Sequence, residues 1–334
     1  MSVSSEPTII VRRQGRIGRI TLNRPKALNA LDAEMITGIV AALEAWREEP
    51  GVQAVVVDAA GDRAFCAGGD VRELRRMAVA GDAAGVEAFF AAEYAMNLMI
   101  ARYPKPYIAV IDGICMGGGV GLSIHGTVRV GTEHAVFAMP ETGIALFPDV
   151  GATYALPRLR GHWGMYLGLT GARLTGADAA WVGFATHVVP RAGVAALIAD
   201  LAQDGVAVLA AVNTPPVETP AVALDLAAFG ADSVAGILGA LEASGTSWAQ
   251  ETLATLRHVS PSAVLWTFEM LRRGAGRTLE QALDAELAMT RQVTKHPDFA
   301  EGVRAMLVDK DRTPKWSPAR IEEVDPAAIR AMVP

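Results

Sequence analysis

Two short apolar runs constrain the fold of this chain more than any other feature. Residues 54–57 read Ala-Val-Val-Val and residues 107–111 read Tyr-Ile-Ala-Val-Ile. Neither run alternates apolar and polar side chains, as a strand with one wet face would. Unbroken runs of this length are typical of strands covered on both faces. Because glycine-bearing turns and helical patterns separate the strands, the sequence predicts an α/β fold whose loops build the site.

Local signals around these runs predict further elements. Residues 8–13 and 16–22 alternate in part about Gly15 and predict a hairpin. Asp32 is a suitable N-cap for a helix over residues 33–49, whose apolar side chains recur on one face. The other elements expected in this half are a loop at 63–70, a helical stretch up to residue 103, a glycine turn at 117–119 that leads into a helix through residue 125, and short strands at 128–130 and 135–138.

Strand signals fade after Gly161, and the rest of the chain has the periodicity of helices. Residues 213–220 contain three prolines and form the best candidate linker. We therefore expect two domains, a core at residues 1–213 and a helical region at residues 214–334. Helices are predicted at residues 192–205, 233–244, 247–257, 262–273 and 278–294.

Composition disfavours several classes of protein. Hydrophobic residues make up 51% of the 334 residues, which allows a sizeable core and argues against disorder. The formal net charge of −6 disfavours a nucleic-acid partner, which would need a basic surface. Residues 107–124 are apolar enough to suggest a membrane span. Asp112 and five glycines within them favour a buried strand, turn and helix instead, so no membrane partner is expected.

Cysteine usage and the N-terminal residues bear on location. Only Cys66 and Cys115 occur, and nothing about them resembles a secreted, disulfide-linked scaffold. Residues 1–7 lack the basic flank and apolar block of a signal peptide. We therefore expect reduced thiols in a cytoplasmic protein.

Several common catalytic motifs are missing from the sequence. No Gly-Lys-Ser or Gly-Lys-Thr phosphate loop occurs, and the dinucleotide pattern begun by Gly117 and Gly119 breaks at Leu122. Ser123 lacks the closing glycine of a hydrolase elbow and falls in an expected helix. The six histidines show no metal-ligand spacing, so we expect neither a metal nor a separate cofactor.

Two acids eight positions apart are the strongest functional signal. Glu141 and Asp149 each follow a proline directly, and the residues around them are almost all apolar. Carboxylates are rarely found inside a protein unless they are paired or used chemically. Burial and a neighbouring acid would both raise the pKa of Glu141. The pair predicts a place where a carbonyl group is polarised and attacked.

Two glycine loops could supply the polarising groups. They are Ala67-Gly68-Gly69-Asp70 and Met116-Gly117-Gly118-Gly119, and the second leads into a short helix whose N-terminus adds positive potential. Glycine lets a ligand approach the backbone closely. Two backbone N–H groups aimed at a carbonyl oxygen form an oxyanion hole, each worth about 2.7–4 kcal/mol. Glycine pairs also mark ordinary turns, but two such loops followed by two acids favour the catalytic interpretation.

Longer stretches resemble a known superfamily. Residues 22–31, 64–70 and 113–121 resemble the enoyl-CoA hydratase/isomerase (crotonase) superfamily. Residues 139–149 and the C-terminal stretch 296–316 are similar to its 3-hydroxyisobutyryl-CoA hydrolase branch. The likeness covers nearly the whole chain. It implies a core of repeated ββα turns with a helical C-terminal region, and a CoA thioester as substrate.

The resemblance also implies roles for individual residues. The amides of Gly69 and Gly118 would form the oxyanion hole. Glu141 and Asp149 would be the acidic pair of the hydrolase branch. Residues implied in substrate binding are Glu93, Gly118, Ala67 and Lys26, of which Lys26 could meet CoA phosphates together with Arg24. Relatives form trimers and hexamers, so a homo-oligomer is possible for this chain.

One departure from the superfamily separates two reactions. Hydratases use two glutamates, and the first would fall at Gly121, which has no side chain. Asp149 stands where hydratases usually carry glycine. The resemblance therefore favours hydrolysis of a short branched hydroxyacyl-CoA, above all 3-hydroxyisobutyryl-CoA in valine catabolism. The alternatives are a hydratase or isomerase acting on an unsaturated acyl-CoA, and a CoA-ester binding protein without turnover.

The sequence does not decide which catalytic role each acid plays. Glu141 would either activate a water or attack directly to give a mixed anhydride. Asp149 would bind the acyl hydroxyl, position water or manage the proton, and a helix beginning near Pro148 would favour its ionised form. The plain alternatives are a helix cap for Asp149, a solvated turn for Glu141 and an exposed helix position for Glu93.

Overall fold

The computed structural model describes residues 6–212 and 226–334. The chain forms two compact units, each assembled from separate stretches of sequence. The first unit comprises Met1–Gly69, Ala95–Phe137 and Leu174–Pro220, and the second comprises Asp70–Tyr94, Ala138–Arg173 and Ala221–Pro334. The predicted linker at residues 213–220 and the domain boundary after residue 213 lie outside the described residues, so that division stays a prediction.

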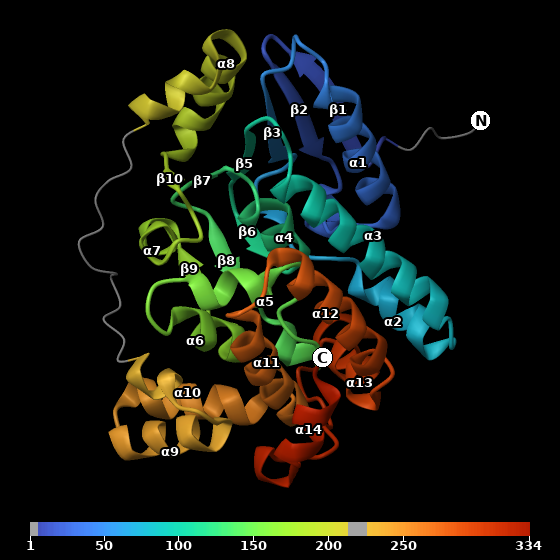
Figure 1. Cartoon of the computed structure of the whole chain (residues 1–334), viewed down its shortest axis with the longest axis vertical. Coiled ribbons are helices and arrows are strands. Elements are labelled where there is room, and N and C mark those ends of the chain that lie inside the picture. Colours follow the sequence, from blue (N-terminus) through green and yellow to red (C-terminus); the bar gives the residue numbers. More distant parts are fainter. Residues whose placement is uncertain (1–5, 213–225) are drawn as a thin grey trace. The chain divides into compact units, whose positions relative to one another are not determined.

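The first unit is built on a six-stranded sheet (Figure 1). Its first two strands form the predicted hairpin and pair antiparallel, and the neighbours that follow pair parallel. The predicted strands at 54–57 and 107–111 lie at its centre. In spatial order the strands are β1 (Ile9–Gln14), β2 (Ile17–Leu22), β3 (Ala54–Ala59), β5 (Tyr107–Ile111), β7 (Val128–Gly131) and β10 (His187–Val188).

Helices cover both faces of this sheet, as the unbroken apolar runs predict. Helix α1 (Ala33–Arg47) is capped by Asp32 and lays Trp46 against Gly18, where a Cβ would lie 2.3 Å from the indole ring. Ile17, the preceding residue of β2, packs instead in the cluster formed with α8 (Val194–Asp204). Successive strand residues point to opposite faces, so α1 and α8 lie on opposite sides. The strands are buried because both of their faces are occupied.

A second, four-stranded sheet in this unit carries the glycine loops. Its order is β4 (Ala64–Cys66), β6 (Ile114–Met116), β8 (Val136–Ala138) and β9 (Leu174–Thr175). The predicted loop at 63–70 is therefore partly wrong, because it contains β4. Strands of two or three residues are too short to show an alternation that a sequence could reveal. The predicted short helix follows β6 as α4 (Gly118–Ile124).

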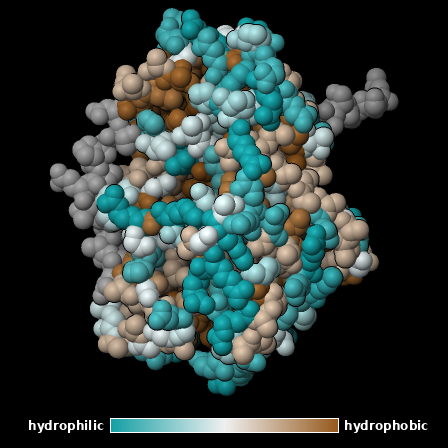
Figure 2. Space-filling model, in the orientation of Figure 1, coloured by the Kyte–Doolittle hydropathy of each residue, from teal (hydrophilic) through white to brown (hydrophobic). Residues whose placement is uncertain are grey.

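Apolar segments of the first unit resemble membrane spans by composition. Residues 107–124 fold as β5, β6 and α4, as predicted. A second segment, Arg191–Ala211, is also long and apolar enough to cross a membrane. It consists of η4 (Arg191–Gly193), α8 and η5 (Gly205–Ala211), and α8 contributes its buried side chains to the sheet's core. Brown atoms gather at the upper left of Figure 2, over this part of the chain. Val206 of η5 is one of the exposed large apolar side chains.

The second unit is almost entirely helical. Four predicted helices are confirmed to within two residues at each end as α9 (Val234–Ser244), α10 (Ser247–His258), α11 (Pro261–Gly274) and α12 (Leu279–Val293). Helix α11 is buried along most of its length, and a Cβ on its Gly274 would lie 1.9 Å from the Thr153 carbonyl oxygen. The other helices that bear on the site are α2 (Val71–Val79), α3 (Ala83–Ala101, in this unit up to Tyr94), η2 (Glu141–Ile144), α5 (Ala152–Ala155), α6 (Trp163–Thr170), α13 (Pro297–Val303) and α14 (Pro326–Met332).

Candidate active site

The two glycine loops lie side by side in the first unit. Strands β4 and β6 pair in parallel, so the loops that follow them leave the same end of the sheet. A Cβ on Gly68 would lie 3.5 Å from the Met116 carbonyl oxygen and 3.9 Å from the Gly118 amide nitrogen. Gly68 has a φ of +117°, a backbone conformation that favours glycine. The pairing of two short strands therefore brings the two expected donor loops together.

Each donor amide is held by backbone structure. Gly69 forms a parallel bridge with Leu31, whose amide donates to the Gly68 carbonyl oxygen at 2.8 Å. Gly118 is the first residue of α4, and N–H groups in a first helical turn have no acceptor within their own helix. A Cβ on Gly119 would lie 2.3 Å from the Cys66 carbonyl oxygen, so this end of α4 rests directly on β4.

The acids gather in the second unit. Glu141 opens η2, Asp149 precedes α5, and Glu93 lies on α3. All three side chains are buried. Asp149 accepts a hydrogen bond of 2.7 Å from the Tyr94 hydroxyl. Glu93 Oε1 and Glu141 Oε2 are buried and have no hydrogen-bond partner among the described residues. Free carboxylate oxygens in a buried cluster are available to a substrate or a water.

Burial and mutual repulsion shift the acids' pKa values. Burial, and then the charge of Asp149, raise the pKa of both Glu93 and Glu141 well above the ordinary value. Burial raises the pKa of Asp149 to about 6, against the lowering effect of the Tyr94 hydrogen bond. The rise expected for Glu141 is therefore confirmed. The Tyr94 hydroxyl donor therefore holds the pKa of Asp149 below the value that burial alone would give it.

Three of the plain alternatives are wrong. Glu93 is 2% exposed and Glu141 is 6% exposed, so neither is a solvated surface acid. Asp149 is not a helix cap, since Gly151 is the N-cap residue of α5. The helix expected near Pro148 begins only at Ala152. The segment between them bends sharply, and the Tyr94 hydroxyl takes the place of a helix N-terminus as the group that favours ionised Asp149.

Sequence reasoning missed two members of this cluster. Tyr94 follows Glu93 directly, and its contact with Asp149 joins residues 55 positions apart. Glu286 of α12 is fully buried and accepts hydrogen bonds from the turn after Asp149. One signal was present: Glu286 falls on the apolar face of its helix, with Ala282 and Met289 one turn away on either side. An acid in such a position requires partners.

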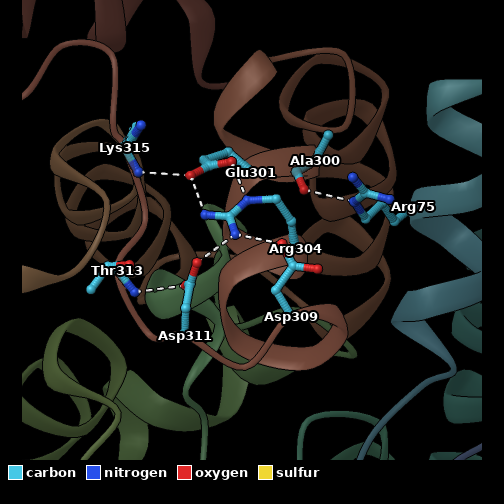
Figure 3. Close-up of polar contacts among 8 residues, drawn as sticks. All are labelled: Arg75, Ala300, Glu301, Arg304, Asp309, Asp311, Thr313 and Lys315. Carbon is cyan, nitrogen blue, oxygen red and sulfur yellow. Dashed lines mark hydrogen bonds and ion pairs between the residues drawn. The ribbon is translucent and has the colours of Figure 1, made fainter.

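Helix α13 supports the turn that carries Glu141. A Cβ on Gly302 would lie 2.7 Å from the Ile144 Cα, so α13 and η2 pack backbone against backbone. Arg75 of α2 donates to the Ala300 carbonyl oxygen at 2.8 Å and ties α13 to α2 (Figure 3). The Glu141 turn is thus backed by a helix from the C-terminal stretch that resembles the hydrolase branch.

Arg304 fixes that C-terminal stretch in turn (Figure 3). Its guanidinium contacts Glu301 at 2.8 Å, Asp309 at 2.7 Å and Asp311 at 2.6 Å. The Arg304 hydrogen bonds lower the pKa of Glu301 to about 2. Glu301 also accepts from the Lys315 amide at 2.8 Å. One cation therefore organises three acids and closes the loop that follows α13.

The remaining site candidates in the first unit differ in exposure. Lys26 lies exposed on the short helix η1 (Pro25–Ala27), free to reach a charged ligand. Arg24 donates to the Ala30 carbonyl oxygen at 2.6 Å and contacts Asp32 at 3.2 Å, so it holds its own loop. Ala67 is half-buried beside Gly68.

Two further positions decide which chemistry α4 can support. Gly121 is buried inside this helix and brings no carboxylate. Ser123 donates to the Gly119 and Val120 carbonyl oxygens of its own helix, unlike a hydrolase nucleophile. Within residues 6–212 and 226–334, no group of three or more His, Cys, Asp or Glu side chains could hold a metal ion.

Comparison of the sequence with known proteins shows which family the chain belongs to. The sequence pattern of the family described as enoyl-CoA hydratase/isomerase matches residues 17–333. The chain belongs to this family. The expected crotonase fold with a helical C-terminal region is confirmed by solved structures. One from Mycobacterium thermoresistibile, named a carnitinyl-CoA dehydratase, has a TM-score of 0.93 and 41% identity, covering 98% of this chain and 97% of its own. One from Rhodobacter sphaeroides, named an enoyl-CoA hydratase, has a TM-score of 0.89 and 42% identity over the same shares.

Curated relatives in this family carry a more specific name. The Xenopus tropicalis protein named mitochondrial 3-hydroxyisobutyryl-CoA hydrolase is 43% identical over 338 residues, covering 94% of this chain and 86% of the relative. The human protein of the same name is 40% identical over 339 residues, covering 95% and 86%. The expected resemblance to this branch of the family is confirmed.

These names contradict the cytoplasmic location predicted from the sequence, because the relatives are mitochondrial proteins by name. The prediction rested largely on cysteine usage. Cys66 and Cys115 are both buried, and neither forms a disulfide in the part of the chain that the structure describes. Reduced thiols exclude only the oxidising compartments, and a buried thiol says little even about those. Cysteine state therefore could not separate the cytoplasm from other reducing locations.

Proposed function

We propose that this chain hydrolyses the thioester of 3-hydroxyisobutyryl-CoA to 3-hydroxyisobutyrate and CoA. The family supplies the acyl-CoA chemistry, and the relatives at 40–43% identity are named for this reaction. The observation that carries the proposal is the buried pair Glu141 and Asp149 in a chain that has glycine at position 121. Hydration of a double bond would need a carboxylate that Gly121 cannot supply.

The amides of Gly69 and Gly118 act as the oxyanion hole in this proposal. Negative charge builds on the thioester oxygen when the carbonyl carbon is attacked, and two fixed N–H donors stabilise that charge. Glycine at these positions keeps side chains away from the approaching ester. The loops' close approach within the first unit supports a joint role, since Gly68 lies against the Met116–Gly118 backbone.

Glu141 delivers the attack on the carbonyl carbon by one of two routes. It removes a proton from water, whose oxygen then bonds to that carbon, or its own carboxylate forms the bond and water later cleaves the anhydride. In both routes the carbon–sulfur bond breaks and the CoA sulfur takes a proton. The raised pKa of Glu141 makes it a stronger base than an ordinary glutamate once ionised.

Asp149 and Glu93 serve the rest of the substrate. Asp149, held by Tyr94, binds the acyl hydroxyl, positions water or passes the proton to sulfur. Glu93 contributes a second buried carboxyl, with one oxygen that no described residue hydrogen-bonds. Ala67 and Gly118 line the ester, and exposed Lys26 meets a CoA phosphate. The reaction needs no cofactor, since CoA is part of the substrate.

The biological setting follows from the substrate. 3-Hydroxyisobutyryl-CoA arises in valine catabolism, and the proposed reaction would release its free acid there. The expected homo-oligomer, with no nucleic-acid or membrane partner, stays a prediction.

Thiol release tests the proposal. The purified protein should liberate free thiol from 3-hydroxyisobutyryl-CoA, and faster than from unbranched or non-hydroxylated acyl-CoA esters. The second candidate is hydration, which the names of the two solved structures favour. Loss of enoyl-CoA conjugation without thiol release would establish hydration and overturn our proposal. Tight binding of the ester with no product would indicate a binding protein instead.

A further inference from the structure

Glu286 accepts three hydrogen bonds from the turn that follows Asp149. One carboxyl oxygen, Oε2, accepts from the Gly151 amide at 2.7 Å. The other, Oε1, accepts from the Thr153 amide at 3.0 Å and from the Thr153 hydroxyl at 2.5 Å. Glu286 is 0% exposed, so water does not compete for these bonds. A carboxyl that fills both of its oxygens with one short segment is well suited to fix that segment.

The segment it holds has an unusual backbone. Val150 and Gly151 follow Asp149 directly, with φ values of +54° and +81°. Positive φ is rare for a β-branched residue such as valine. Such conformations persist only where the surroundings impose them, and they cluster at functional sites. Helix α5, which begins at the next residue, has only four residues and no side-chain cap to impose it.

We propose that Glu286 is a positioning residue, which holds the left-handed turn at Val150 and Gly151 and so sets where the Asp149 carboxyl points. Tyr94 fixes the carboxyl group directly, and Glu286 fixes the backbone two residues beyond it. The two supports come from different helices, α3 and α12. The catalytic half of this inference rests on the proposed thioester hydrolysis.

Glu286 also belongs to the electrostatics of the cluster. Burial raises its pKa to about 8, while the Thr153 and Gly151 hydrogen bonds oppose the rise. The groups that interact with it electrostatically are Asp149, Tyr94 and Arg277. Replacement of its carboxyl group would therefore alter the titration of its neighbours as well as the turn.

The test compares Glu286→Gln with a matched control, Glu269→Gln. Glutamine keeps the volume of Glu286, but one of the carboxyl oxygens is replaced by an NH₂ group. That group cannot accept a hydrogen bond from the backbone N–H it faces, so at least one hydrogen bond to the turn is lost. Glu269 is another buried glutamate of the second unit, on α11, and it pairs with Arg272 instead. We expect Glu286→Gln to lower kcat roughly 10- to 100-fold with KM changed less than about threefold. Glu269→Gln should retain kcat.

Two additional readouts separate positioning from simple loss of packing. The acidic limb of the kcat pH profile should shift in Glu286→Gln and not in the control. Amide hydrogen exchange at Gly151 and Thr153 should quicken at least tenfold, with the melting temperature of the rest of the protein retained. Thr153→Val, which removes only the hydroxyl donor, should show a smaller change of the same kind and serves if Glu286→Gln does not fold.

The outcomes distinguish this inference from the proposed function. Unchanged kcat in folded Glu286→Gln, or an equal loss in Glu269→Gln, would overturn the positioning role even if the wild-type protein hydrolyses the ester. A wild-type protein that releases no thiol would overturn the proposed function, and amide exchange at Gly151 and Thr153 would then decide whether Glu286 holds the turn. Unchanged exchange there would end the inference.

Discussion

The glycine loops of the first unit and the acid cluster of the second are built in opposite ways. The loops need only local sequence and the pairing of two neighbouring strands, β4 and β6. The cluster draws Glu93, Glu141, Asp149 and Glu286 from four separate places in the chain. Backbone N–H donors lose their function when the backbone around them shifts. Carboxyl groups lose theirs when a substitution removes their ability to ionise. The two regions should therefore fail in different ways when they are altered.

The two regions also differ in how much their burial reduces the stability of the fold. In the described part of the chain, none of the four buried acids forms an ion pair with Lys or Arg. Burying an acid without a compensating cation either raises its pKa or destabilises the fold. The glycine loops carry no such penalty. A protein retains a costly cluster of this kind where the shifted titration is useful.

The largest expected effect lies in the acid cluster. Glu141→Gln removes the group that attacks or activates water and should lower kcat for thiol release by roughly 10³-fold, as loss of a general base or nucleophile does. Asp149→Asn should lower it less, by about 10²-fold. Circular dichroism should show both variants folded. Turnover within twofold of wild type in both would remove the acids from the mechanism.

The next effect lies in the glycine loops and concerns shape. Gly119→Ala would place a methyl group 2.3 Å from the Cys66 carbonyl oxygen, which forces backbone apart and should lower the free energy of unfolding by about 1–3 kcal/mol. Gly193→Ala, where an added Cβ meets no atom of the described residues within 4 Å, is the matched control. Urea denaturation measures both. Equal stability of the two variants would contradict the close packing of α4 on β4.

The pH dependence of stability sharpens the contrast in charge. Folding raises the pKa of Glu286 from 4.5 to about 8 and that of Asp149 from 3.8 to about 6. The native state then binds more protons than the unfolded state, so these groups favour folding most below about pH 4 and lose that contribution as pH rises toward 8.

The measurement is the free energy of unfolding at pH 5 and pH 8.5. The decline between them should be smaller in Glu286→Gln than in wild type, by on the order of 1–3 kcal/mol. A slope in Glu286→Gln equal to that of wild type would show that Glu286 does not titrate in this range.

The smallest expected effect concerns Tyr94. Tyr94→Phe keeps the ring and removes the donor to Asp149, whose pKa should then rise above about 6 because the hydrogen bond lowers it. The acidic limb of the kcat profile should move to higher pH, with kcat near neutrality reduced about 3- to 10-fold. An acidic limb at the wild-type position would mean that another group sets it.

Sequence reasoning reached the two regions unequally. The central strands, the hairpin, α1 and the helices α9 to α12 follow from periodicity and, for α1, from the cap at Asp32. Both glycine loops and Glu141 with Asp149 stood out because glycine and buried acid are informative in themselves. Strand β4 was too short to have a period.

The sequence did not identify Glu286 and Tyr94 as members of the acid cluster, for a different reason. Each lies in a segment with an ordinary helical pattern, and only the tertiary fold brings it to Asp149. The left-handed turn at Val150 could not be foreseen either, since valine favours extended backbone. Its cause is a contact over more than 130 positions, between Gly151 and Glu286.

The clustering of acids has a consequence after the bond is cut. In the proposed reaction the released acid is itself an anion, and it forms next to Glu141. The charges of Asp149 and Glu93 both act on Glu141 and raise its pKa. Like charges repel strongly where little water screens them. The uncharged acyl end of the thioester would therefore be accepted where the anionic acid product is repelled, which would favour release of that product after each turnover.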